Sequence, residues 1–302
     1  MTSTQGARPI VVGVDPDPSR RSALAWAADE ADRRGLPLRL VHARGMTTSG
    51  YWSGEFRTGR EQWEFREGWE EAARDAGERV LEDAAAFARR RRPRLEVSRR
   101  SADGHPAWVL REQARDAAMA VVGSRHLSRT EELLGSASVS LPLAAHAPCP
   151  VAVVPEPEHT ARQPAHFVVG VDGSPDSAAA IDFAFEAAAL RGAELRALCV
   201  WRPPLLGALS REAAEQEGRR VLSESLDGPA AARPEVEVRQ EFVRGHPVQV
   251  LAEASAHALG LVVGSRGRGG FAGMLLGSVS QGVLRHARCP VLVVPASGGR
   301  AA

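Results

Sequence analysis

A glycine-rich stretch in the C-terminal half of the chain has the spacing of a phosphate-binding loop. It begins Gly264-Ser-Arg-Gly267, and after nine further residues it continues with Gly277-Ser278. Glycines allow positive φ angles and let backbone N–H groups approach an anion closely. Gly277-Ser278 is also predicted to begin a helix, whose free N–H groups and dipole favour negative charge. This segment, the glycine loop, is therefore predicted to bind a polyphosphate; a flexible surface loop before a capped helix is the alternative.

Positive charge for such a site must come from arginine. All 38 basic residues of the chain are arginine, so it has no Walker A lysine and no lysine that could form a Schiff base. Arg266 and Arg268 lie within the glycine loop, and Ser278 and Ser280 follow it with hydroxyl donors. We therefore expect one of the two arginines to supply the charge that a lysine gives in other phosphate sites.

The chain contains an internal repeat. Val-Val-Gly-Val-Asp at 11–15 recurs at 168–172, and Gly-His-Pro at 104–106 recurs at 245–247. Further along, Val-Val-Gly-Ser-Arg and Cys-Pro-Val-x-Val-Val-Pro each occur twice in the same order. This pattern predicts two homologous domains, residues 1–155 and 166–302, joined by a polar, proline-containing linker at 156–165.

Each repeat alternates short apolar strands with helices. In the second repeat the pattern predicts a capped helix that starts at Ser174-Pro175, and it predicts further strands and helices after it. Strands separated by helices imply a parallel, doubly wound sheet, in which ligands bind beyond the carboxyl ends of the strands. Asp172 and Gly264 are predicted to lie at two such ends. The remaining expected strands are 195–200, 235–242, 260–264 and 290–294, and the remaining helices are 210–226, 247–258 and 277–287.

Taken together, these motifs resemble the universal stress protein family. The resemblance depends on Val-Gly-Val-Asp172-Gly-Ser, Gly245-His-Pro247, the glycine loop and the closing Cys-Pro-Val-Leu-Val-Val-Pro, and it covers nearly the whole chain twice. It implies the α/β class, with two tandem Rossmann-like (flavodoxin-like) domains, each a five-stranded, mostly parallel sheet with helices on both faces. It also implies ATP binding with Mg2+ beside the triphosphate, and a regulatory or sensing role in stress adaptation or dormancy.

By motif match, the resemblance implies an adenine nucleotide site in the second repeat. Asp172 would lie near the nucleoside, the backbone of Val200 would contact the adenine, and the glycine loop would surround the phosphates. The residues expected to bind the nucleotide are Asp172, Gly173, Ser174, Val200, Gly264, Ser265, Arg266, Gly267, Arg268, Gly277, Ser278, Val279 and Ser280.

The first repeat departs from this pattern. His126 replaces the second glycine, Ala137 aligns with the last one, and Glu131-Glu132 bring negative charge toward the expected phosphates. The turn after Asp15 also carries a further carboxylate, Asp17. We therefore predict that the second repeat binds ATP and that the first binds it weakly or not at all. The weaker site would consist of Asp15, Ala43, Gly123, Ser124, Arg125, Ser138, Val139 and Ser140.

Three other features have competing interpretations. His146-x2-Cys149 and His286-x2-Cys289 could hold zinc, but each cysteine begins an apolar strand, so we interpret both pairs as structural. Residues 51–69 contain six of the fifteen aromatic residues; they fit a partner surface, a lid over the first site or the packing of a long helix. In the resembled family the closing strands pair antiparallel, so strands 151–154 and 291–294 are expected to join the repeats as a pseudo-dimer, with a homodimer possible.

The charge and composition of the chain argue against several classes of function. A net charge of +1 argues against a nonspecific nucleic-acid binder, and no apolar run approaches the ~20 residues needed to cross a membrane. The N-terminus lacks the pattern of a signal peptide, so a cytoplasmic location is expected. No general base is evident beside the predicted γ-phosphate, which favours a regulatory module over an enzyme. An ATP-using hydrolase or nucleotidyl transferase, and a nucleotide-free protein-binding scaffold, are the alternatives.

Overall fold

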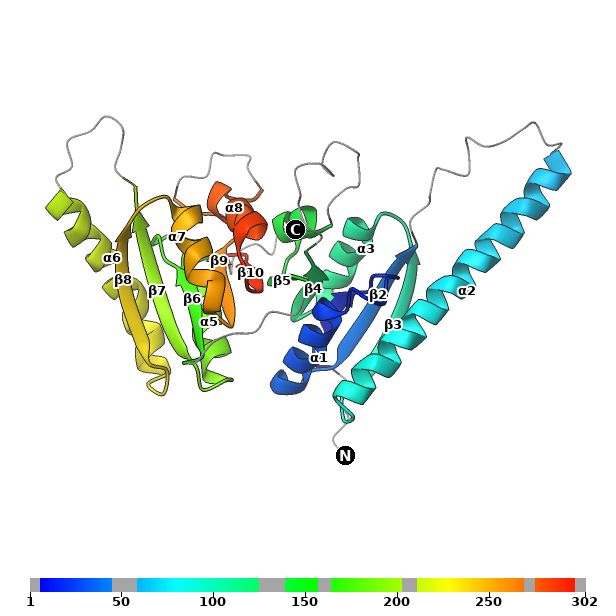
Figure 1. Ribbon diagram of the computed structural model, residues 1–302, viewed down its shortest axis with the longest axis horizontal. Coiled ribbons are helices and arrows are strands. Elements are labelled where there is room, and N and C mark those ends of the chain that lie inside the picture. The colour runs from blue at the N-terminus through cyan, green and yellow to red at the C-terminus, as the bar shows by residue number, and fades with distance from the viewer. Residues whose placement is uncertain are drawn as a thin grey trace. The chain divides into compact units, whose positions relative to one another are not determined.

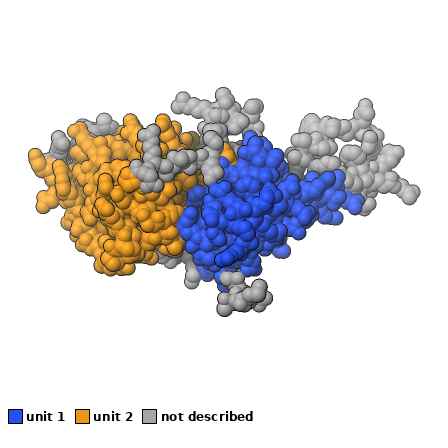
Figure 2. Space-filling model, turned by 60° about the horizontal axis from the view of Figure 1, so that its bottom comes forward, with its two compact units in different colours: residues 1–122 blue, residues 123–302 orange. Residues whose placement is uncertain are grey.

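The computed structural model describes residues 6–44, 59–124, 139–156, 164–202, 211–268 and 275–296. The chain divides into two compact units, Met1–Val122 and Gly123–Ala302 (Figure 2). This division falls before residue 155 because the last strand of the first repeat pairs with a strand of the second unit. The boundaries predicted from the repeats, and the linker between them, stay a prediction.

The first unit contains one parallel sheet with strand order β3-β2-β1-β4. Strands β1 and β4 are short, buried apolar runs, whereas β3 is largely polar, and the long helix α2 packs on β2 and β3 (Figure 1). In chain order its elements are β1 (Ile10–Gly13), α1 (Ser22–Arg34), β2 (Leu38–Arg44), α2 (Gly59–Arg91), β3 (Val97–Asp103), α3 (Pro106–Gln113), a 3-10 turn (Ala114–Asp116) and β4 (Met119–Gly123).

The second unit contains the strands in the order β5-β10-β9-β6-β7-β8. All neighbouring pairs are parallel except β5 and β10, which are antiparallel, as predicted for the closing strands. Its elements are α4 (Ser140–His146), β5 (Val151–Val154), β6 (His166–Gly170), α5 (Pro175–Ala189), β7 (Glu194–Trp201), α6 (Arg211–Ala232), β8 (Val238–Arg244), α7 (Pro247–Ala254), a 3-10 turn (Ser255–His257), β9 (Gly260–Gly264), α8 (Ser278–His286) and β10 (Val291–Val294).

Helices cover both faces of the second sheet, which confirms the predicted α/β class. A Cβ built on Gly170 would face Leu251 of α7, whereas a Cβ on Gly264 would face Asp176 of α5. Gly170 lies beside Val263 in the register, and successive residues of a strand point to opposite faces, so α5 and α7 lie on opposite faces. The core between these layers includes the fully buried side chains of Phe167, Phe185, Ile181, Leu195, Leu198 and Leu222.

All predicted elements of the second repeat are present, but several of their ends were wrong. The helix predicted at 247–258 ends at Ala254 and is followed by the 3-10 turn, and the strand predicted at 235–242 spans Val238–Arg244. Helix α6 continues to Ala232, beyond the predicted end at residue 226, and includes Pro229 in its final turns. A proline there removes only one amide donor, and its own carbonyl still accepts a hydrogen bond from Arg233 N–H at 3.1 Å. Within the described ranges, no helix is long and apolar enough to cross a membrane.

Candidate functional site

The turn after β6 is fixed by the side chain of Asp172. Asp172 Oδ1 accepts a hydrogen bond from Ser174 N–H at 3.0 Å, which closes a tight turn through Gly173 at φ +73°. Ser174 then caps α5, because its hydroxyl oxygen accepts the N–H of Ser177 at 3.2 Å, and Pro175 is the first helical residue. The predicted cap at Ser174-Pro175 is therefore confirmed, and it ends the β6 strand beside the glycine loop.

Asp172 also joins this turn to the glycine loop. Its second oxygen, Oδ2, accepts the backbone N–H of Arg268 at 3.0 Å. A Cβ on Gly267 would run into the same Asp172 oxygen, so the loop can approach the carboxylate only because residue 267 is glycine. The structure thus brings Asp172 together with Gly267 and Arg268, although Arg268 follows Asp172 by 96 positions in the sequence.

A second carboxylate, Asp176, holds the start of the glycine loop. Asp176 lies in the first turn of α5 and is only 5% exposed. Its Oδ2 accepts hydrogen bonds from Ser265 Oγ at 2.7 Å, from Arg266 N–H at 2.9 Å and from Arg266 Nε at 3.4 Å. A Cβ on Gly264 would lie 2.7 Å from the Asp176 carbonyl carbon, so this glycine allows β9 to end against α5.

Asp176 is absent from the residues that the sequence predicted for the site. In the sequence it reads as an ordinary acidic residue in the first turn of a helix, where it would favour the helix dipole. The contact with residues 265 and 266, which follow about 90 positions later, becomes visible only once β6 and β9 lie side by side. The only sequence pattern that includes Asp176 is therefore Ser-Pro-Asp-Ser, which predicts the start of a helix and not a contact with the glycine loop.

The start of α8 is held close to the end of β9. Gly277 N–H donates to Ser265 O at 2.8 Å, and the Ser280 hydroxyl donates to Gly264 O at 2.7 Å. Gly277 precedes the helix in an extended conformation, with no side-chain capping bond and no acidic residue in the first turn of α8. The N-terminus of this helix therefore meets the backbone of the glycine loop without an internal carboxylate to neutralise it.

Gly277 differs from the other two loop glycines in what surrounds it. Its φ of −67° suits any residue, and a Cβ there would have its nearest neighbours, Arg266 Cα and Ser265 O, at 3.4 Å. By contrast, Gly264 and Gly267 are required by Asp176 and Asp172, respectively. Among the described residues, these contacts therefore explain Gly264 and Gly267 but give no structural reason for Gly277.

Val200 lies beyond the end of the ladder between β6 and β7. The last backbone hydrogen bond between these segments runs from Val171 N–H to Leu198 O at 2.9 Å, while Trp201 O accepts from Gly245 N–H on the other side of β7. Peptide groups alternate in direction along a strand, so the N–H and C=O groups of Val200 point to the same side of β7 as those of Leu198, which is the side of β6. Val200 is half-buried there, next to the turn of Asp172.

Cys199 and Arg268 lie between this strand end and helix α6. Burial raises the pKa of the Cys199 thiol, the charge of Asp172 raises it further, and Arg268 lowers it in part. A Cβ on Gly173 would lie 2.7 Å from Arg268 Nη2, so the guanidinium lies over the turn. A groove of about 410 Å³ extends from there between α5 and α6. The second repeat thus places a cation at the carboxyl ends of its strands.

The corresponding turn of the first repeat is built differently. Asp15 Oδ1 accepts Asp17 N–H at 2.9 Å, as in the second repeat, but α1 begins only at Ser22 and has no acidic residue in its first turn. Asp17 Oδ1 accepts both N–H and Oγ–H of Ser19, and these bonds lower the Asp17 pKa. The longer turn of the first repeat is therefore stabilised by hydrogen bonds among its own residues.

The other residues predicted for the first site are described only in part. Ala43 occupies the position of Val200, and Ser124 N–H donates to Val154 O at 2.7 Å, as Ser265 N–H does to Val294 O at 2.8 Å. Gly123 is exposed, whereas Gly264 is buried. Val139 and the buried Ser140 lie at the start of α4, a helix of seven residues. Outside the described residues lie Arg125, His126, Glu131, Glu132, Ala137, Ser138, and Tyr51, Trp52 and Phe56 of the aromatic segment.

Known proteins match this chain over both repeats. The Universal stress protein family matches the chain twice, at residues 6–155 and 165–295. The chain belongs to this family. Universal stress protein Rv2623 of Mycobacterium tuberculosis is 33% identical over 97% of this chain and 98% of its own length, and a universal stress protein of Mycolicibacterium smegmatis is 36% identical over 94% and 96%.

Solved structures agree on the fold. The crystal structure of a universal stress protein from Archaeoglobus fulgidus superimposes with a TM-score of 0.63, covering 95% of this chain and 96% of that one at 19% sequence identity. At this identity the likeness concerns the fold alone. This universal stress protein is therefore a tandem member with α/β units, as the sequence predicted.

Proposed function

We propose that this tandem universal stress protein binds ATP in its second repeat and acts as a regulatory or sensing module in stress adaptation. The observation that carries the proposal is Gly277. Among the described residues, packing leaves room for a side chain at this position, which lies between the start of the glycine loop and the N-terminus of α8. A phosphate group against the Gly277 Cα would account for the glycine, because backbone N–H groups can then reach the anion closely.

The remaining parts of the site fit a nucleotide. Arg266 and Arg268 provide the two cations of the described loop, and Ser278 is exposed at the first turn of α8. The free peptide group of Val200 would contact the adenine, and Asp172 would lie beside the ribose. When bound, the phosphates of ATP would bring negative charge beside the two arginines.

Mg2+ would be held by the phosphates and water rather than by the protein. Both Asp172 oxygens already accept backbone N–H groups, and Asp176 Oδ2 accepts three hydrogen bonds. Mg2+ usually keeps several waters and is held through substrate phosphates with few carboxylates, so these engaged side chains do not conflict with its presence.

The same contacts support a regulatory protein over an efficient enzyme. A general base must have a free acceptor within hydrogen-bond reach of the attacking water. Asp172 and Asp176, the two carboxylates of the described site, are turned toward loop amides and a hydroxyl instead. We expect at most slow ATP hydrolysis. A cytoplasmic location and a homodimer stay predictions.

Mass spectrometry of gently purified full-length protein tests this function. We expect bound adenine nucleotide, and multiple-turnover assays with added ATP and Mg2+ should give little product beyond the uncatalysed rate. Rapid turnover would favour the hydrolase or transferase alternative. Absence of nucleotide in the purified protein, together with no binding of added ATP, would overturn the proposal and favour a protein-binding scaffold.

A further inference from the structure

We propose that Asp176 is a positioning residue that sets the glycine loop in its phosphate-binding form before the nucleotide arrives. The inference rests on the proposed function, since it names a residue that acts on the same site. Asp176 would not contact the nucleotide. It would act through the backbone of residues 265 and 266 and through the side chain of Arg266.

The burial of Asp176 makes the loop contact necessary. A carboxylate that is 5% exposed is stable as an ion only if its oxygens are well paired, because water cannot solvate it. Three donors from the loop converge on Oδ2: Ser265 Oγ, Arg266 N–H and Arg266 Nε. Movement of residues 265 and 266 away from α5 would remove all three bonds at once, so this part of the loop is held against the helix.

The same contacts orient Arg266. Its Nε is within 3.4 Å of Asp176 Oδ2, yet its side chain is 55% exposed. The guanidinium is therefore tethered at one nitrogen and open to solvent elsewhere. An arginine fixed in this way loses less rotamer freedom when it meets an anion, and preorganised donors bind more tightly than mobile ones.

The corresponding helix of the first repeat, α1, differs at this position. It has no acidic residue in its first turn, and its N-cap is Arg21, with no side-chain capping bond. The guanidinium of Arg21 lies 5.3 Å from the ring centroid of Phe87 instead. Asp176 is therefore a difference between the two repeats that lies outside the glycine pattern.

The test compares Asp176→Asn with Glu30→Gln in the full chain. Glu30 is a matched control, because it is a carboxylate 1% exposed that is bonded to Arg33 and Arg34 but lies on α1 of the first unit. Calorimetry with ATP and Mg2+ should show affinity about tenfold to a hundredfold lower in Asp176→Asn, since hydrogen bonds to a charged group are lost. Glu30→Gln should bind ATP as the unmodified chain does.

Two further measurements distinguish positioning from general stability. Hydrogen exchange of the nucleotide-free protein should show lost protection at the Arg266 amide in Asp176→Asn, and unchanged protection there in Glu30→Gln. In an Arg266→Gln background, Asp176→Asn should cost less affinity than it does alone, because part of its effect passes through that side chain.

The outcomes separate the two proposals. Equal ATP affinity in the unmodified chain and in Asp176→Asn, with the Arg266 amide still protected, would overturn the positioning role and leave the proposed function intact. An equal loss of affinity in Glu30→Gln would also overturn it, because a general loss of stability would then be the cause. An unmodified chain that does not bind ATP would overturn the proposed function and this inference together.

Discussion

The two repeats use the same turn after their first strand but connect it to different partners. In both, an aspartate side chain accepts the N–H two residues later, at 2.9 Å for Asp15 and 3.0 Å for Asp172. In the second repeat the other oxygen of Asp172 accepts a backbone N–H of the glycine loop. In the first, Arg20 of the same turn lies near Asp15, at 3.8 Å. The same local motif therefore contacts the glycine loop in the second repeat and lies beside an arginine of its own turn in the first.

The entry into the following helix differs in the same way. Helix α5 begins three residues after Asp172 with a serine cap, a proline and the buried Asp176, whereas α1 begins seven residues after Asp15 without a capping side chain. The shorter connection brings a carboxylate to the glycine loop. We conclude that the second repeat is organised around this loop by residues from its first helix as well as by the loop glycines.

The largest expected effect comes from Gly277→Ala. The added Cβ fits within the protein, since its nearest neighbours would be at 3.4 Å, so the melting temperature should hardly change. If a phosphate lies against this position, ATP affinity should fall by about a hundredfold, because several charge-assisted hydrogen bonds lengthen together. Calorimetry with ATP and Mg2+ measures the change.

Gly228→Ala is the control for this variant. It adds the same methyl group to α6 at a position with no neighbouring atom within 4 Å and should leave ATP affinity unchanged. Gly267→Ala is a poorer probe, since its Cβ would meet the Asp172 carboxylate even without nucleotide. Undiminished binding by Gly277→Ala would contradict the assignment of Gly277 to the phosphate.

A smaller effect should separate the two aspartates. Asp172→Asn removes the negative charge of the carboxylate that accepts the Arg268 N–H, and it should weaken ATP binding about tenfold. Asp15→Asn makes the same chemical change in the first repeat and should alter the affinity of the chain by less than about twofold. Titration of both variants with ATP would check this, and equal losses would show that the first repeat binds nucleotide as well.

Part of this site was predictable from the sequence, and part was not. The cap at Ser174 and the positions of Asp172 and Gly264 at strand ends follow from local patterns, because turns, caps and apolar runs are encoded by neighbouring residues. The roles of Gly264 and Gly267 depend on side chains about 90 positions away, Asp176 and Asp172. Spacing alone could not distinguish glycines required by packing from Gly277, which packing does not require.

The helix ends show the same limit. Helix α6 continues to Ala232, past the predicted end at residue 226 and through Gly228-Pro229. In the first repeat the long helix α2 ends in three arginines, Arg89, Arg90 and Arg91. There the local pattern and the tertiary contacts agree, because arginines near a helix C-terminus favour the dipole and also bond to α1.

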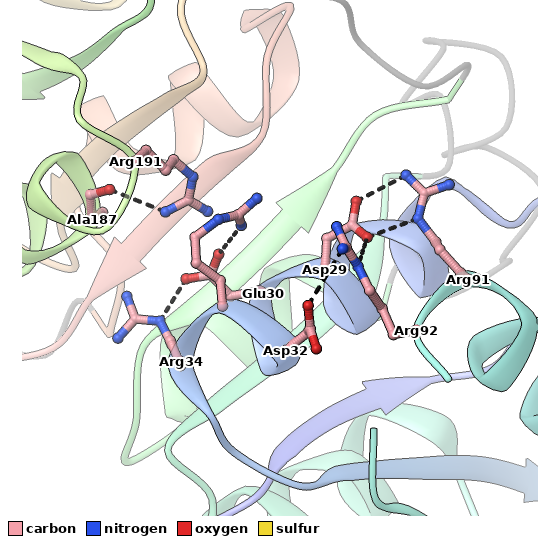
Figure 3. A network of polar contacts seen from close by, with 9 residues as sticks. Asp29, Glu30, Asp32, Arg34, Arg91, Arg92, Ala187 and Arg191 are labelled. Atoms are coloured by element: carbon pink, nitrogen blue, oxygen red, sulfur yellow. Dashed lines mark hydrogen bonds and ion pairs between the residues drawn. The ribbon is translucent and has the colours of Figure 1, made fainter. Parts of the chain in front are cut away.

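The smallest effect concerns the stability of the first unit. Asp29 of α1 accepts hydrogen bonds from Arg91 Nε and Nη2 and from Arg92 Nε at 2.8–2.9 Å (Figure 3). Burial by itself would raise the pKa of Asp29, but the bonds from the two arginines outweigh it and lower the pKa. A carboxyl group with a lowered pKa stabilises the folded state above its unfolded pKa of about 3.9 and loses that contribution as the pH falls through the folded value.

Asp29→Asn should therefore lower stability by about 1 kcal/mol at pH 7. The difference from the unmodified chain should shrink below about pH 4, where the carboxylate becomes protonated. Urea denaturation followed by tryptophan fluorescence suits this test, because five of the six tryptophans lie within the first 122 residues. ATP affinity should not change; a loss of affinity would mean that the first unit takes part in nucleotide binding.

The number of ATP molecules bound per chain tests the asymmetry of the repeats most directly. Calorimetric titration of the full-length protein with ATP and Mg2+ should give one site per chain, and Gly277→Ala should weaken that site about a hundredfold. Two sites of equal affinity, or a single site that survives Gly277→Ala and disappears with Asp15→Asn, would contradict the account.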